Sequence, residues 1–205
     1  MRFFLFIIMS LFYGCSKEND ENYLNEIRDF QEELNHSFYD MDETPLRGEL
    51  YENFKGHPFF SIQKKYRIES DYERITDSET FEMMTSSGES KTFLPYAKAK
   101  FQLDGKSHEL ILYQSQSLIE FPEYEDYLFL PFKDATNGYE TYAGGRYLDL
   151  KIPEGSKIII DFNKAYQPYC AYNLEDYSCP IVPKENHLNI RIPAGVTYHK
   201  DDFKF

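Results

Sequence analysis

Residues 96–114 read YAKAKFQLDGKSHELILYQ and carry the clearest structural signal in the chain. Up to residue 103, small or apolar side chains alternate with polar ones, which is the period of a strand with one buried face. Asp104 and Gly105 follow, and a second apolar run begins directly after them. Asp-Gly between two such runs is the strongest short-range signal for a β-hairpin. The sequence therefore predicts two antiparallel strands joined by a tight turn.

Further strand-like segments lie at short intervals on both sides of this hairpin. Residues 66–73 alternate in the same way, and residues 127–131, 146–150, 157–162 and 188–192 are also predicted strands. Near the N-terminus the apolar spacing changes to three and four residues, which is one face of a helix: Tyr23, Ile27, Phe30, Leu34 and Phe38. We expect a mainly β fold, an antiparallel barrel or sandwich with one N-terminal amphipathic helix, in a single domain over residues 23–205.

Composition excludes some classes of function. The chain has 205 residues, with 22 Lys and Arg against 35 Asp and Glu, a formal charge of −13. A nucleic-acid partner is not expected, because phosphate backbones require clustered positive charge. Adsorption to an anionic lipid surface through charge is disfavoured for the same reason. Apolar residues make up 41% and aromatic residues 18%, which is enough for a packed core.

The first 22 residues indicate where in the cell the protein is located. Residues 3–13, FFLFIIMSLFY, form an apolar run that is too short to span a membrane, and Gly14 and Cys15 follow it. A small residue before Cys resembles the lipobox of bacterial lipoproteins, with aromatic residues typical of Bacteroidetes-type signals. We therefore expect a lipoprotein signal peptide over residues 1–14, a lipid on Cys15, and a polar acidic tether over residues 15–22. The resemblance implies attachment to the outer membrane, on its periplasmic or surface face.

Cys170 and Cys179 are the two cysteines left in the predicted domain. In an oxidising envelope, such a pair favours a disulfide, while free thiols and a metal site remain alternatives. The spacing does not match the short Cys pairs of metal sites, so no metal is expected. Both cysteines lie in residues 163–186, a loop rich in proline and tyrosine, and a loop of this length in a compact domain is often functional.

Two polar residues next to this region are candidates for chemistry. Asp161 ends an apolar strand, where it is either a general base or ligand, or a residue that with Asn163 holds the strand-to-loop turn. Arg146 follows a Gly-Gly pair, and its guanidinium suits either a bound anion or an internal ion pair with Asp134 or Asp161. The residues alone leave both choices open.

Three blocks resemble signature segments of a bacterial family of the domain-of-unknown-function 1684 kind, many members of which are predicted lipoproteins. They are KDATNGYETYAGGRYLDL, DFNKAYQPYCAYN and YSCPIVPKENHLNIRIPAG. The resemblance implies no activity and no cofactor. It implies that a shared site uses the following residues, without a role for any of them: Arg146, Tyr147, Asp161, Asn163, Tyr166, Cys170, Cys179, Glu185 and Asn186.

Three functions are consistent with these features. The first is a non-enzymatic envelope lipoprotein that binds a small molecule or an envelope protein in a pocket lined by Tyr166, Tyr169 and Tyr172. The second is a hydrolase in which Asp161 or Glu185 acts as a base and Arg146 holds an anionic group; this requires the three to converge. The third is a structural protein in which the cysteine loop only closes one end of the fold.

Overall fold

The computed structural model describes residues 9–198, with side chains from Asp20 onward. The predicted signal peptide therefore lies partly outside the described residues, and Cys15 is described only through its backbone. Helix α1 spans Met9–Tyr39, so the segment assigned to the tether has helical backbone. Among the described residues, no helix has both the length and the apolar character needed to cross a membrane.

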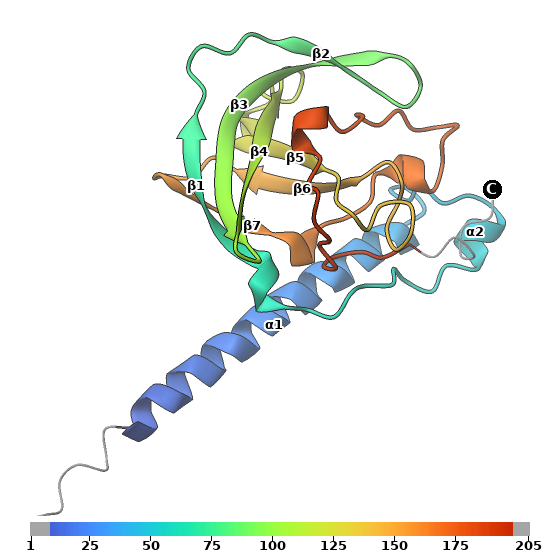
Figure 1. Cartoon of the computed structure of the whole chain (residues 1–205). Coiled ribbons are helices and arrows are strands. Elements are labelled where there is room, and N and C mark those ends of the chain that lie inside the picture. Colours follow the sequence, from blue (N-terminus) through green and yellow to red (C-terminus); the bar gives the residue numbers. More distant parts are fainter. Residues whose placement is uncertain (1–8, 199–205) are drawn as a thin grey trace, which may run out of the picture.

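The amphipathic face of α1 is confirmed. Tyr23, Ile27 and Phe38 are buried, and Phe30 and Leu34 between them are half-buried. A second, short helix, α2, spans Glu49–Glu52. In Figure 1, α1 runs beneath one end of the sheet, and its N-terminal part extends away from the rest of the protein. The helix is therefore anchored to the β domain through one stripe of apolar side chains.

The β domain is an antiparallel sheet curled into a half-barrel (Figure 1). Its strands are β1 (Arg67–Arg74), β2 (Phe81–Met84), β3 (Ser90–Leu103), β4 (Lys106–Ser115), β5 (Tyr127–Phe132), β6 (Arg146–Lys151) and β7 (Lys157–Asp161). Their order in the sheet is β6-β5-β4-β3-β1-β7, and β2 pairs with β3 outside this path. The mainly β prediction with an N-terminal helix is confirmed.

The predicted hairpin forms the centre of this sheet. Leu103 faces Lys106, and the two turn residues between them have positive φ, 50° at Asp104 and 74° at Gly105. Positive φ at both positions matches the right-handed twist of the flanking strands, and Asp-Gly adopts it readily. The alternating residues of β3 point into the core, where Ala97, Ala99 and Phe101 are buried.

One predicted strand is wrong, and one strand was not predicted. Residues 188–192 form no strand but run as irregular chain, because their backbone groups bond to a loop and a side chain rather than to a neighbouring strand. The Leu188 amide donates to the Lys133 carbonyl, and the Ile192 amide donates to the Asp134 carboxylate. The apolar side chains of Leu188 and Ile192 are nevertheless buried against the sheet. The unpredicted strand is β2, which lies at the sheet's margin.

Candidate functional site

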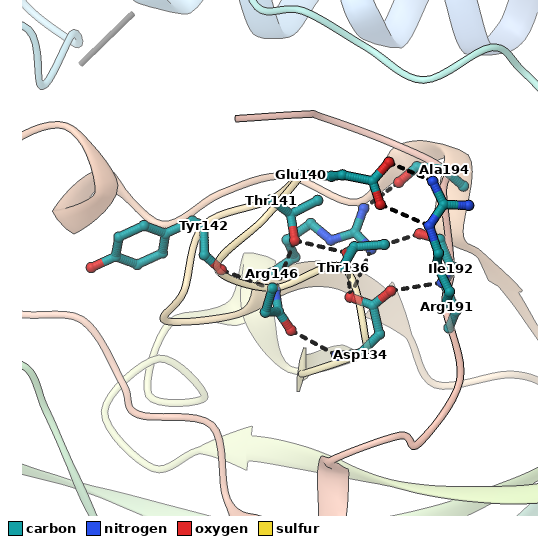
Figure 2. Close-up of polar contacts among 10 residues, drawn as sticks. Asp134, Thr136, Glu140, Thr141, Tyr142, Arg146, Arg191, Ile192 and Ala194 are labelled. Carbon is teal, nitrogen blue, oxygen red and sulfur yellow. Dashed lines mark hydrogen bonds and ion pairs between the residues drawn. The ribbon is translucent and has the colours of Figure 1, made fainter. Parts of the chain in front are cut away.

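Arg146, the first residue of β6, is fully buried and serves as an internal clamp (Figure 2). Its Nη2 donates to Asp134 Oδ1 at 3.3 Å and to the Ile192 carbonyl at 2.9 Å, and its Nη1 donates to the Ala194 carbonyl. The guanidinium therefore ties β6 to the segment that precedes the C-terminus. Both Nη atoms bond inside the protein, while Nε is buried without a hydrogen-bond partner among the described residues, so the internal ion pair is the arrangement found.

Asp134 is equally enclosed. Its Oδ1 accepts from the Thr136 hydroxyl at 2.7 Å, and its Oδ2 accepts from the Ile192 amide at 2.7 Å. Glu140 and Arg191 form a second ion pair beside this cluster, nearer the surface (Figure 2). The cluster joins the 134–141 loop, β6 and the C-terminal segment, which is an architectural role.

Asp161 and Asn163 lie where β7 meets α1. The Asp161 carboxylate accepts from the Tyr23 hydroxyl at 3.0 Å and from the Asn163 amide at 3.0 Å. Asn163 Nδ2 donates to the Tyr23 hydroxyl at 2.9 Å, and its Oδ1 accepts from the Gln63 amide. Burial, with the adjacent Asp161 carboxylate, raises the pKa of the Tyr23 hydroxyl well above its usual value. These bonds dock α1 onto the sheet.

Glu185 and Asn186 lie against β4 and β5. Asn186 is fully buried; its amide exchanges two hydrogen bonds with the backbone of Ile111 and donates a third to the Pro131 carbonyl at 2.7 Å. The side chain thereby satisfies backbone groups where β4 and β5 diverge. Glu185 is exposed and accepts from the Tyr113 hydroxyl at 2.9 Å.

Arg146, Asp161 and Glu185 therefore share no contact. Each belongs to a different polar cluster, in which its partners come from the protein itself. The hydrolase alternative required the three to converge, and this arrangement does not support it. Among the described residues, no group of three or more His, Cys, Asp or Glu side chains is placed to hold a metal ion.

Tyr147 and Tyr166, by contrast, meet at an open pocket of about 450 Å³. Their backbones pair, with N–H···O distances of 2.9 and 3.1 Å, and their rings make an edge contact at 6.1 Å between centroids. The wall is completed by α1, the start of β3 and the cysteine loop. The other lining residues are Phe30, Leu34, Lys91, Asp149, Pro168, Tyr169, Tyr177, Ser178, Cys179 and Pro180.

Asp149 is the acidic group of this pocket. Its Oδ1 accepts hydrogen bonds from the Tyr127 hydroxyl at 2.6 Å and the Tyr166 hydroxyl at 2.8 Å. Within residues 20–198, its Oδ2 has no hydrogen-bond partner. Desolvation by the surrounding rings raises the pKa of the carboxyl, and the two hydroxyls, which lower it, offset part of that rise. One carboxylate oxygen is fixed by the protein, and the other is free to accept from a ligand.

The cysteine loop forms the opposite wall. Cys170 and Cys179 are joined, which confirms the predicted disulfide. Cys179 lines the pocket, and the Tyr169 and Tyr177 rings pack edge to face at 5.0 Å. Tyr172 does not line it: this ring is buried beside Phe38, at 5.0 Å between centroids. Of the three tyrosines expected at one pocket, Tyr166 and Tyr169 are therefore placed there.

Sequence reasoning missed Asp149, Lys91 and Tyr177. A signal for Asp149 was present, because it lies two residues after Tyr147 in a predicted strand and therefore on the same face. Lys91 and Tyr177 gave no such signal, since they reach the pocket from other parts of the chain. A second hollow, at Tyr23 and Arg67, contains cations that already pair with Asp20, Glu26 or Asp161.

Comparisons with known proteins relate the chain to one family and to a solved structure. A family model described as "Protein of unknown function (DUF1684)" matches residues 52–197. The chain is also similar to an uncharacterized protein of Haloarcula marismortui with a solution NMR structure. The two share 30% sequence identity and a TM-score of 0.67, over 88% of this chain and 97% of that one. No curated protein matches the sequence.

Proposed function

Because the chain belongs to the family described as "Protein of unknown function (DUF1684)", whose description assigns no activity, we propose a function from the geometry of its site. The protein is a lipid-anchored protein of the cell envelope that binds a small organic ligand without transforming it. The observation that carries this proposal is the pocket lined by Tyr147, Tyr166, Tyr169 and Tyr177, with a free oxygen on Asp149. Apolar walls with a few fixed polar groups are the usual composition of small-molecule sites.

Binding is favoured over catalysis because of how the polar residues are used. The carboxylates and the arginine that a hydrolase would need are engaged in separate structural clusters. The pocket offers rings and one pair of charged side chains, which orient a ligand but supply no recognised nucleophile and base in contact. The purely structural alternative gives no reason for an open space lined by four tyrosines.

Replacing Tyr177 with alanine is expected to weaken ligand binding by about twofold to tenfold, the effect of losing one aromatic contact. The measurement screens a panel of amino acids, sugars and organic acids by thermal shift and calorimetry on the full chain in a polyoxyethylene detergent, which carries neither sugar nor charge. Tyr139→Ala is the matched control, because this ring is 87% exposed and lies outside the pocket. Failure of every compound to bind, or equal affinities in wild type and Tyr177→Ala, contradicts the proposed function.

The anchor is proposed from Gly14-Cys15 and the apolar run before them. Several acyl chains on Cys15 would hold the protein firmly, at about 0.8 kcal/mol per buried CH₂ group. Tyr23, the first buried residue among the described side chains of α1, follows eight positions later. At about 1.5 Å per helical residue, the domain would begin about 12 Å from the lipidated residue. With this short separation, the proposed binding domain would lie close to the outer membrane.

Cys15→Ser is expected to move the protein from the membrane fraction to the soluble fraction and to abolish incorporation of labelled palmitate. The physical reason is that the acyl chains are the proposed attachment. Ser16→Ala, the neighbouring change, should leave both readouts as in wild type. Retention of Cys15→Ser in the membrane pellet would show that something other than this lipid holds the protein there.

A further inference from the structure

Two side chains of opposite charge line the tyrosine pocket from different strands. Asp149 lies on β6, and Lys91 lies near the start of β3. Both are exposed, and in the part of the chain with described side chains neither has an ion-pair partner. Elsewhere on the sheet, opposite charges do pair, as Lys100 does with Glu73 and Lys157 with Asp71. The pocket therefore contains a carboxylate and an ammonium group that no described side chain neutralises.

The carboxylate is preorganised for a donor. Tyr127 and Tyr166 both donate to Oδ1 of Asp149, which fixes the plane of the group and leaves Oδ2 open. A charge-assisted hydrogen bond from an ammonium group to this oxygen is stronger than one between neutral groups. The tyrosine rings around it add attraction, because the negative face of an aromatic ring favours a cation.

Lys91 determines which charge the rest of the ligand should carry. A ligand with only an ammonium group would bring its positive charge into a pocket that already contains this lysine. A carboxylate on the same ligand would instead pair with Lys91, while an apolar body contacts Phe30, Leu34 and the rings. Complementary charge at both ends suppresses wrong ligands as well as attracting the right one.

We propose that the pocket binds a small zwitterion that carries one ammonium and one carboxylate group, of the free amino acid class. The ammonium group donates to Asp149 Oδ2, and the carboxylate pairs with Lys91. This inference rests on the proposed function and names the ligand class for the same site. The competing ligands are a simple amine, which uses Asp149 alone, and a neutral sugar, which stacks on the rings and uses neither charge.

The experiment is calorimetric titration of the full chain, in micelles of a polyoxyethylene detergent that carries neither sugar nor charge, with four probes. L-leucine is the zwitterion, isoamylamine is leucine without its carboxylate, 4-methylpentanoate is leucine without its amine, and D-glucose is the neutral probe. The variants are Asp149→Asn, which retains Oδ1 for both tyrosine hydroxyls, and Lys91→Met. The matched controls are Asp77→Asn and Lys106→Met, both exposed and outside the pocket.

L-leucine is expected to bind more tightly than the other three probes. Asp149→Asn should weaken it by about tenfold or more, the effect of removing one charged hydrogen-bond partner. Lys91→Met should weaken it by about twofold to fivefold, as expected for an exposed ion pair. Isoamylamine should respond to Asp149→Asn but not to Lys91→Met, and the two controls should bind leucine as wild type does.

Four results would overturn the zwitterion proposal: no binding of leucine, leucine affinity unchanged in Asp149→Asn, or isoamylamine or 4-methylpentanoate binding as tightly as leucine. If glucose or another compound of the screening panel then binds in a manner that depends on Tyr177, the ligand-binding function stands and only the ligand class is wrong. If no probe and no panel compound binds, both proposals fail.

Discussion

Asp134→Ala is expected to lower the free energy of unfolding by about 3–5 kcal/mol, because it leaves the Arg146 guanidinium buried without its counter-charge. Both side chains are 0% exposed. The change also removes an acceptor from the Thr136 hydroxyl, which keeps its contact with the Thr141 hydroxyl, and from the buried Ile192 amide. Urea unfolding of the full chain at pH 7, followed by circular dichroism, measures the loss.

Glu140→Gln is the matched control for this prediction. Glu140 belongs to the same loop and pairs with Arg191, but this pair lies in contact with solvent, where an ion pair contributes about 1 kcal/mol or less. The double variant Asp134→Leu with Arg146→Met should recover part of the lost stability, since neither charge then remains buried. A loss for Asp134→Ala no larger than that for Glu140→Gln would show that the buried pair does not hold the C-terminal segment in place.

The hairpin and the N-terminal helix were predictable because their signals are local. The turn at Asp104-Gly105 depends only on the backbone angles of those two residues. The apolar stripe of α1 depends only on the regular spacing of its apolar residues. The segment 188–192 has the composition of a strand, but a strand also needs a neighbour with free backbone groups. The Asp134 carboxylate binds the Ile192 amide instead, and nothing within the segment itself indicates that contact.

The candidate site was predictable only in part for the same reason. Tyr147 and Tyr166 came from the family resemblance, and the pocket does join them. Arg146 looked equally suited to an external anion or to an internal pair, because the residues near it do not reveal how deeply it is buried. Lys91 and Asp149 are far apart in the chain, and the fold brings both to one pocket. Such convergence depends on topology, which local patterns do not determine.

His57 is expected to make the protein less stable in mild acid. It is 7% exposed and packs among aromatic rings, with centroid distances of 4.3 Å to Phe38, 5.1 Å to Phe54 and 5.7 Å to Tyr172. Its Nδ1 lies 2.8 Å from Asn35 Oδ1, which can only accept, so Nδ1 carries the proton of the neutral ring. Burial lowers the pKa of the imidazole from 6.5 to about 4. The His57 ring therefore binds a proton less readily in the folded protein than in the unfolded chain.

The difference between the folded and unfolded pKa of His57 determines the direction of the stability change and the pH range in which it occurs. Above pH 6.5 the ring is neutral in both states, and its contribution to stability is complete. As the pH falls from 6.5 towards 4, only the unfolded chain is protonated, so stability is lost progressively; below the folded pKa both states are charged and the loss ends. At about 1.4 kcal/mol per pKa unit, the full loss is about 3 kcal/mol.

Urea unfolding of wild type, His57→Phe and His36→Gln at several pH values between 4 and 7 isolates this contribution from that of other titrating groups. His57→Phe removes the titrating ring and the bond to Asn35, so it should lower stability at pH 7 but lose less than wild type on acidification. His36 lies on an exposed part of α1, and its replacement should leave the wild-type slope unchanged. Parallel pH profiles for wild type and His57→Phe would mean that the buried imidazole is not the group whose protonation the folded state resists.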